Sequence, residues 1–435
     1  MNFAHHLFAS SAIVLGLCAM PAAAQSDMRS PAVSYLMQQH GISETEAQER
    51  MDVQLLVTDL AQDLNTTNDP AFGGIYIQHE PVFKVVVSFA DKDDRKAFQS
   101  ALSPKLQRFV QIRNAKRNKR DIESGIAALN DAFAATNAAF VGGYDLKKER
   151  YTYTVGSQDI AQQFRSLVPP QLRSDVDIDI GATPGLEAAP TGAQAGDSIR
   201  GGQTAYRTTG SASCTFSYAV NYTSGTTAKR GILTAGHCPD TLVHKIGSRN
   251  VTLSGPVVQR QTCGVGGKYD YKILETTGLN TSYTIEYKDL NSIPEFPATG
   301  TLNLTSIKSF NNQTAGMVMC KSGQTTGITC GKITDGNASF RDNGTGCTTG
   351  TASTGFIKVS QSQQADLSAG GDSGGPWFMY PGSSSDIVGV GIHTAGGCKP
   401  GVSPCQSDTG PTAYSLYMPI DYIDDHISSV STVKK

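Results

Sequence analysis

The chain has 435 residues, more than one hydrophobic core normally serves, so two or three domains are expected. Lys and Arg total 36 against 38 for Asp and Glu, and the net charge of −2 argues against a general nucleic-acid binder, which needs a basic face. Only 17% of the residues are charged and 45 are Gly, which excludes a coiled coil and a highly charged disordered chain. No internal run of about 20 apolar residues indicates a membrane span.

Residues 1–24 have the pattern of a secretory signal peptide. The stretch from Leu7 to Met20 is almost continuously apolar, and Pro21 with three alanines follows as a small-residue cleavage site. The first residues carry no Lys or Arg, so a short buried helix is the alternative. Export would bring the chain into an oxidising compartment, extracellular or periplasmic. Eight of the nine cysteines lie after residue 213, where disulfides are therefore expected.

Residues 25–180 predict a cysteine-free α+β region. Ser43 and Glu46 form a capping-box pattern ahead of apolar residues at helical spacing. Two more helices are expected, one through the basic stretch 105–120 and one over residues 122–133. The basic stretch is interpreted as a solvated helix face rather than a binding patch. Strands are expected at residues 75–78, 83–89 and 151–155.

Residues 181–196 are rich in Gly, Ala, Pro and Thr, a composition that predicts a linker and a processing site. Beyond the linker, short runs of Val, Ile, Thr and Tyr alternate with clusters of Gly, Ser and Asn. Many short strands with Gly-rich turns indicate an all-β sandwich or barrel, here over residues 197–435.

The chemistry-bearing residues lie in this second half. Ser373 sits in a tight glycine loop, in which the N–H groups of Gly371 and Ser373 could donate to a developing oxyanion. Serine is a weak nucleophile at neutral pH and needs an adjacent base, which His237 could supply. A carboxylate must then hold the imidazole tautomer, and Asp270 is the best candidate because it opens a β-like run.

The sequences around these residues resemble the chymotrypsin-like serine peptidases. Thr234-Ala235-Gly236-His237-Cys238 and Gly371-Asp372-Ser373-Gly374-Gly375-Pro376 resemble the motifs of that family, and His237, Asp270 and Ser373 occur in the family's order. The stretch from Cys320 to Gly331 resembles the bacterial α-lytic protease and streptogrisin branch. The resemblance covers about residues 197–425. It implies two six-stranded antiparallel β-barrels, with His237, Asp270 and Ser373 as the catalytic triad in the cleft between them.

The resemblance also has implications for the region before the peptidase. In size and element order, residues 25–180 are similar to the pro-region of that branch, a folding chaperone and inhibitor. The chain is therefore expected to be a secreted, self-processed zymogen and a monomer. Its expected partners are peptide or protein substrates and its own pro-region, without a metal or other cofactor.

The resemblance implies particular cysteine and ion pairs. It suggests the disulfides Cys214–Cys238 and Cys320–Cys330. Cys398–Cys405 is expected as a short local loop, and Cys263–Cys347 follows by elimination among many possible connectivities. An ion pair is expected between Lys321 and a buried Asp372, and an exposed Lys321 is the alternative.

The specificity pocket is predicted from four residues. Leu367 stands where trypsin-like relatives carry an aspartate, so a preference for basic residues is not expected. His393, Thr394 and Gly396 lie in a segment that resembles the pocket wall of glutamyl endopeptidases, whose matching histidine contacts a substrate carboxylate. The residue before the cut, P1, is therefore predicted to be Glu. A small or medium apolar residue is predicted instead if His393 only packs behind the pocket.

Two other classes of protein are alternatives to the peptidase. A catalytically inactive homologue that acts as a binding protein would usually have lost a triad member, whereas all three are present here. An α/β-hydrolase esterase would need a Gly-x-Ser-x-Gly elbow and the order Ser, Asp, His. Asp372 breaks that elbow, and the order differs.

Overall fold

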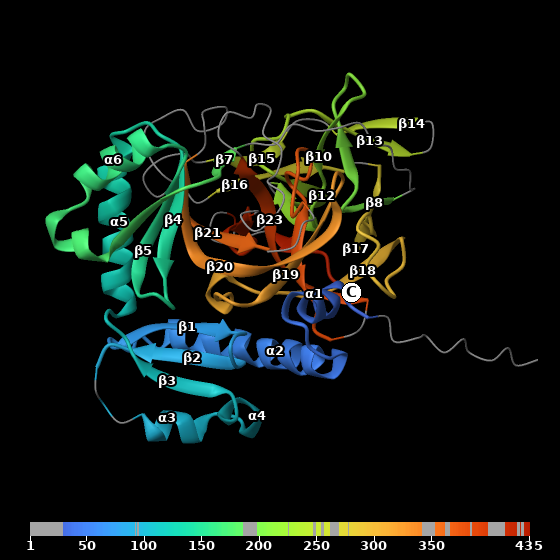
Figure 1. The fold of residues 1–435 in the computed structure, drawn as a ribbon. Helices are drawn as coiled ribbons and strands as arrows, with labels where there is room; N and C mark the ends of the chain where they lie inside the picture. The colour runs from blue at the N-terminus through green and yellow to red at the C-terminus, as the bar shows by residue number, and fades with distance from the viewer. Residues whose placement is uncertain are drawn as a thin grey trace, which may run out of the picture.

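The computed structural model describes residues 29–435 except 92, 94, 186–197, 225, 247–248, 254–255, 262–268, 277, 342–352, 362–365, 383–384, 399–413, 424–426 and 428–429. The predicted signal peptide, Cys263, Cys347 and Cys405 lie outside the described residues. Within them, the chain begins with helices and short strands, three of which form a separate sheet, and continues as a long series of strands (Figure 1). None of the helices in this part is both long and apolar enough to cross a membrane.

The first half mixes helices and strands, as its sequence predicts. Ser43 Oγ accepts a hydrogen bond from the Glu46 N–H at 3.2 Å, which confirms the predicted start of α2. The expected strand pair is also present, with β1 antiparallel to β2. The elements are α1 (Pro31–His40), α2 (Glu44–Thr66), β1 (Phe72–Gln78), β2 (Lys84–Phe89), α3 (Lys96–Ala101), α4 (Pro104–Gln107), β3 (Val110–Asn114), α5 (Lys119–Ala134), β4 (Phe140–Asp145), β5 (Arg150–Val155), α6 (Gln158–Leu167), β6 (Val176–Ile180) and β7 (Thr183–Gly185).

The predicted helix over residues 105–120 is wrong. Within these bounds only 105–107, in α4, and 119–120, at the start of α5, are helical, and β3 pairs in parallel with β2. Val110 and Ile112 lie on the same face of β3. Their contacts within the sheet determine the structure of this segment despite the helical spacing of the basic side chains.

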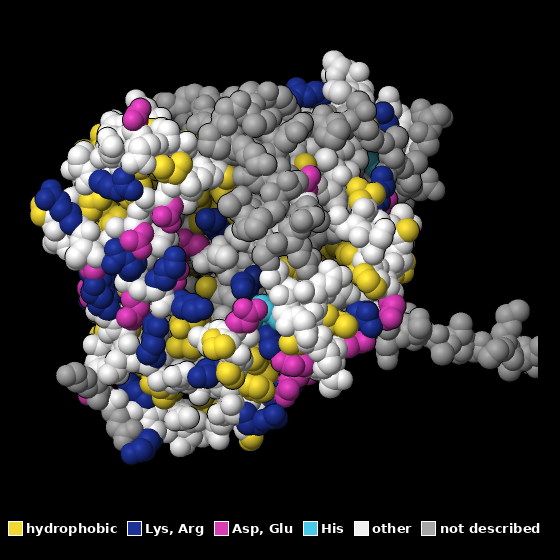
Figure 2. Space-filling view, in the orientation of Figure 1, with side chains coloured by type: hydrophobic (Ala, Val, Ile, Leu, Met, Phe, Trp, Pro, Cys, Tyr) yellow, Lys and Arg dark blue, Asp and Glu magenta, His cyan; other side chains and the backbone are white. Residues whose placement is uncertain are grey.

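The basic side chains of this stretch are paired with acidic ones. Lys105 lies 2.9 Å from Asp52, and Lys116 and Arg117 both contact Asp175. Charges of both signs are interspersed over the first half (Figure 2). Such an arrangement supports a solvated surface rather than a basic binding patch.

The second half is almost entirely β. One sheet has the order β10-β9-β13-β14 and another the order β15-β16-β12-β11-β25, while the remaining strands join a thirteen-stranded sheet. The strands are β8 (Ser198–Gly201), β9 (Thr204–Tyr206), β10 (Ala212–Thr215), β11 (Ala219–Ser224), β12 (Thr227–Thr234), β13 (Leu242–Ile246), β14 (Arg249–Leu253), β15 (Pro256–Gln261), β16 (Asp270–Glu275), β17 (Asn280–Lys288), β18 (Thr299–Ile307), β19 (Val318–Gly323), β20 (Gly327–Arg341), β21 (Ser353–Ser360), β22 (Pro376–Met379), β23 (Asp386–Cys398), β24 (Tyr414–Pro419) and β25 (Ser431–Thr432).

The two halves share a sheet and a core. Strand β4 pairs antiparallel with β20, so the sheet β6-β5-β4 continues into the second half (Figure 1). Val53 of α2 belongs to the same apolar cluster as Met319 and Trp377. Strand β7, which pairs with β23, lies within the first residues of the predicted linker, and residues 186–196 of that linker are outside the described residues. The first half is therefore packed onto the second rather than tethered to it.

Candidate active site

Ser373 occupies a tight loop directly before β22. Gly371 and Gly374 adopt positive φ angles of 97° and 88°, which disfavour any residue with a side chain. A Cβ at Gly374 would also lie 2.2 Å from Thr234 Oγ1, so the loop packs closely on the end of β12. The two glycines thus let the loop turn sharply and bring the serine against the strand that leads to His237.

Sheet pairing brings the histidine and the aspartate together. His237 follows β12 and Asp270 opens β16, and these strands pair antiparallel with Thr234 opposite Lys272. His237 Nδ1 lies 2.9 Å from Asp270 Oδ2, and the His237 N–H donates to Asp270 Oδ1 at 2.9 Å. His237 Nε2 lies 2.9 Å from Ser373 Oγ. The three residues predicted from the sequence therefore form one continuous hydrogen-bonded series.

Burial and hydrogen bonding oppose each other at Asp270. Burial alone would raise the pKa of this carboxyl, but the charge attraction and hydrogen bonds of His237 outweigh it and lower the pKa. The Thr394 side chain lies beside the carboxylate and contributes in the same direction. Asp270 is accordingly ionised at neutral pH and able to stabilise a positive imidazolium.

The backbone around Ser373 carries two amides suited to an oxyanion. Among the described residues, neither the Gly371 nor the Ser373 N–H donates to a protein acceptor. Their neighbours in the loop are engaged, since the Asp372 N–H donates to Ala369 O at 3.0 Å and the Gly374 N–H to His393 O at 2.8 Å. N–H donors that are not used by another acceptor can stabilise the negative charge that develops beside a nucleophile.

Sequence reasoning missed Thr215, which holds the nucleophile loop. Its N–H donates to Ser373 O and its hydroxyl to Gly371 O, each at 2.8 Å. The neighbouring Cys214 forms a disulfide with Cys238, so the same strand is also tied to the histidine loop. A threonine next to a cysteine carries no local pattern that marks this role.

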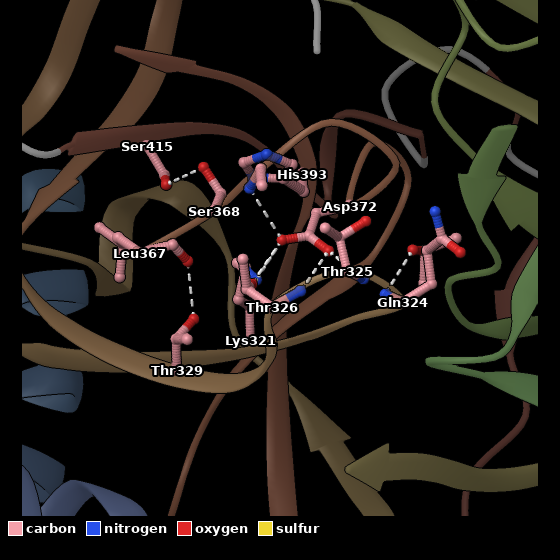
Figure 3. A network of polar contacts seen from close by, with 12 residues as sticks. Lys321, Gln324, Thr325, Thr326, Thr329, Leu367, Ser368, Asp372, His393 and Ser415 are labelled. Atoms are coloured by element: carbon pink, nitrogen blue, oxygen red, sulfur yellow. Dashed lines mark hydrogen bonds and ion pairs between the residues drawn. The ribbon is translucent and has the colours of Figure 1, made fainter. Parts of the chain in front are cut away.

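Asp372 is the centre of a buried polar network (Figure 3). Lys321 Nζ donates to Asp372 Oδ2 at 2.8 Å, and neither side chain is exposed, so the expected ion pair is present and the exposed alternative for Lys321 does not hold. The Thr326 hydroxyl donates to the same oxygen at 2.6 Å, and the Thr325 N–H to the other at 2.9 Å. Burial would raise the pKa of Asp372, but Lys321 and the remaining partners lower it. The Cys320–Cys330 disulfide joins β19 to β20 beside this network.

Lys272 lies two positions after Asp270, on β16. Its side chain is fully buried, and Nζ donates to Cys238 O and to Asp240 Oδ1, the latter at 2.8 Å. Asp240 is 64% exposed. Lys272 thus anchors the chain directly after His237.

The four predicted pocket residues lie in different surroundings. Leu367 is buried, and its carbonyl accepts from the Thr329 hydroxyl at 2.7 Å. His393 is also buried, and its ring faces Asp372 (Figure 3). Trp377 Nε1 donates a hydrogen bond to His393 Nδ1 at 3.2 Å. Because indole N–H is only a donor, a neutral His393 carries its proton on Nε2. Gly396 pairs with Gly185 of β7.

The chain matches no protein-family model, and no curated protein matches it. Among solved structures, it is similar to a glutamic-acid-specific serine protease described as using a histidine triad in substrate binding, with 23% identity and a TM-score of 0.36 over 54% of this chain and 100% of that chain. It is also similar to Thermobifida fusca protease A, with 22% identity and a TM-score of 0.36 over 55% and 100% of the two chains. Cellulomonas bogoriensis chymotrypsin gives 21% identity and the same TM-score and coverage.

Proposed function

We propose that this protein is a secreted serine endopeptidase made as a zymogen. The observation that carries the proposal is the hydrogen-bonded series Asp270–His237–Ser373, with both steps at 2.9 Å. The uncommitted N–H groups of Gly371 and Ser373 complete a set of nucleophile, base, orienting carboxylate and oxyanion donors.

Each group has a defined task in acyl transfer. Ser373 Oγ attacks the peptide carbonyl while His237 Nε2 takes its proton. Asp270 accepts the Nδ1–H and stabilises the imidazolium, which then protonates the leaving amine. The Gly371 and Ser373 amides stabilise the tetrahedral oxyanion. Water then attacks the acyl-enzyme while His237 takes a proton from it. His237 returns that proton to Ser373 Oγ, and the free serine is restored.

The first half serves as the pro-region in this proposal, with its end within residues 186–196. Its strand β4 extends the sheet of the second half at β20, and its strand β7 lies on β23 at Gly396. A region that supplies such strand pairings can template a β domain whose own contacts are distant in sequence and therefore slow to form. A strand lying on the pocket edge would also obstruct substrates, which accounts for inhibition before maturation.

The P1 preference is proposed to be Glu, with a small or medium apolar residue as the second possibility. The measurement that separates them is the ratio of kcat/KM for Glu and Leu peptide substrates, in wild type and in His393→Ala. A ratio above one that collapses in His393→Ala supports carboxylate recognition by His393. A wild-type ratio well below one supports the apolar preference.

The test of the whole proposal is covalent labelling with a serine-directed phosphonate. The protein should be labelled at Ser373, and Ser373→Ala should lose both the label and peptide hydrolysis. A matched Ser217→Ala variant, altered at another buried serine of the same half, should keep both. A wild-type protein that neither reacts with the phosphonate nor cleaves peptides would be an inactive homologue instead.

A further inference from the structure

The two proposed oxyanion donors are held in different ways. Each N–H belongs to a planar trans peptide, in which the N–H points opposite to the carbonyl of the preceding residue. The Ser373 N–H is therefore oriented by Asp372 O, which accepts from the Gly375 N–H at 2.8 Å within the same loop. The Gly371 N–H is oriented by Gly370 O, whose hydrogen-bond donor comes from another part of the chain. One oxyanion donor is thus fixed locally, and the other needs a contact from outside the loop.

The outside contact is the side chain of Thr325, in the loop between β19 and β20. Its hydroxyl donates to Gly370 O at 2.5 Å. Its N–H donates to Asp372 Oδ1 at 2.9 Å, and the Thr326 hydroxyl donates to Asp372 Oδ2 at 2.6 Å (Figure 3). Because this segment is itself anchored on the buried aspartate, the Thr325 hydroxyl has a fixed position relative to the nucleophile loop.

A second contact from the same segment acts on the other side of Gly371. The Gln324 N–H donates to Thr215 Oγ1 at 3.0 Å, and the Thr215 hydroxyl donates to Gly371 O at 2.8 Å. Threonine hydroxyls therefore hold both the carbonyl before the Gly371 α-carbon and the carbonyl after it. Glycine itself restricts the rotation of its neighbouring peptides very little, and Gly371 has a φ of 97°. The direction of the Gly371 N–H accordingly depends on these two contacts.

We propose that Thr325 is a positioning residue for the oxyanion donor Gly371. Its hydroxyl holds the Gly370–Gly371 peptide in the orientation in which the N–H faces the tetrahedral intermediate. Without the hydroxyl, Gly370 O loses this donor, and the peptide can rotate and turn the N–H away from the oxyanion. The inference rests on the proposed peptidase function and adds to it a residue that acts through Gly371 and does not touch the substrate.

The test compares two variants that differ in the hydroxyl. Thr325→Val keeps the branched shape of the side chain and removes the hydroxyl, whereas Thr325→Ser keeps the hydroxyl. In peptide hydrolysis by the processed enzyme, Thr325→Val should lower kcat by about 10- to 100-fold, because the donor is misplaced rather than removed. KM should be unchanged, since the oxyanion forms only in the transition state. Thr325→Ser should restore most of the lost kcat.

Inhibitor binding separates positioning from a general loss of structure. Ser373 Oγ adds to the carbonyl carbon of a peptide aldehyde, and the oxygen of the adduct lies on the oxyanion donors. The matching peptide alcohol forms no such adduct. Thr325→Val should weaken the aldehyde about as much as it lowers kcat and leave the inhibition constant of the alcohol unchanged. Equal weakening of both inhibitors, or a wild-type kcat, would overturn the proposal.

Thr305→Val is the matched control. The Thr305 hydroxyl of β18 donates to Ile387 O at 3.1 Å, and both threonines are half-buried, so this variant loses the same kind of hydrogen bond at a position that the proposed chemistry does not use. It should keep wild-type kcat and wild-type affinity for both inhibitors. Thr325→Ala compared with Thr325→Ser repeats the test with smaller side chains, so the result does not depend on the folding of a single variant.

The outcomes separate this inference from the proposed function. If hydrolysis and phosphonate labelling depend on Ser373 while Thr325→Val keeps wild-type kcat, the positioning role fails and the peptidase proposal stands. If the wild-type protein neither reacts with the phosphonate nor hydrolyses peptides, the peptidase proposal fails, and the inference about Thr325 fails with it.

Discussion

The two halves of the chain hold their charged side chains in different ways. In the first half, ion pairs lie at or near the surface, as at Lys116, Arg117 and Asp175. In the second half, Lys321 and Asp372 are both fully buried beneath the nucleophile loop. Surface pairs contribute little because water screens them, whereas a buried charge that loses its partner is costly. The buried Lys321–Asp372 pair is therefore tied to the site, whereas the exposed Lys116 of the first half is replaceable.

The largest effect is expected where a buried charge takes part in the proposed chemistry. Asp270→Asn should lower kcat by about 10⁴-fold, because the amide holds the wrong imidazole tautomer and cannot stabilise the imidazolium. The measurement is steady-state hydrolysis of a peptide substrate by the processed enzyme. Glu295→Gln, at a carboxylate of the second half that is 65% exposed, should retain wild-type kcat. A loss of less than 10-fold in Asp270→Asn would argue against Asp270 as the orienting carboxylate.

The motifs around His237 and Ser373 were predictable because they are local, whereas the rest of the candidate site was not, because it depends on pairing between distant residues. Glycines around Ser373 and the residues around His237 carry their pattern within a few positions. Thr215, in contrast, meets Gly371 only after folding, over a separation of 156 residues. The same limit applies to the fold, where the capped helix α2 was predicted and the pairing of β4 with β20 was not. The helical spacing of residues 105–120 also gave a wrong prediction at β3, because pairing with the neighbouring strand β2 determines the structure there.

The two buried lysines of the second half, Lys321 and Lys272, differ in how exposed their carboxylate partners are. Lys321→Met should lower the free energy of unfolding by about 3–5 kcal/mol, because Asp372 is left buried without its cation. Lys272→Met should cost less, because its carboxylate partner Asp240 is exposed and can be hydrated. Urea unfolding of both variants in the Ser373→Ala background, which avoids self-digestion, measures the difference. Equal costs would show that burial of the lysine alone decides the loss.

The contact between the halves includes a pH-dependent contribution at His79. This buried ring has Nε2 2.7 Å from Gly316 O and Nδ1 3.4 Å from Arg50, and His40 stacks on it at 4.9 Å. Burial lowers the pKa of His79 to about 3, and His40, Lys332 and Arg50 act in the same direction.

The sign follows from the lowered pKa of a base. The stabilisation is complete above the ordinary histidine pKa near 6.5 and is lost as the pH falls from there toward 3, by about 1.4 kcal/mol per pH unit. Relative to the Ser373→Ala background, His79→Gln should therefore become progressively more stable as the pH falls from 6.5. Urea titrations at several pH values measure this slope, and parallel curves would contradict it.

Asp335 of β20 provides the opposite control. This half-buried side chain lies against Gly143 of β4, where a Cβ would come within 2.0 Å of its Oδ2. Burial raises its pKa to about 6, despite the Asn337 N–H and Lys358, and Asp145 adds to the rise. Its stabilisation is therefore complete below the ordinary value of 3.8 and is lost as the pH rises toward 6. Asp335→Asn should gain relative stability over that rise, so the two variants should show slopes of opposite sign.

The smallest effect is expected in the first half, at Lys116. Its side chain is 49% exposed, and Asp175 keeps the better buried Arg117 as a partner when the lysine is removed. Lys116→Met should therefore lower the free energy of unfolding by less than about 1 kcal/mol. Arg117→Met should cost more, because its guanidinium is only 16% exposed and also lies over the Tyr151 ring at 5.6 Å. Urea unfolding at 0.1 M and 1 M salt tests both, since added salt should remove most of the Lys116 effect and less of the Arg117 effect. A Lys116→Met loss as large as that of Lys321→Met would mean that exposed and buried charges contribute alike, and the contrast between the two halves would fail.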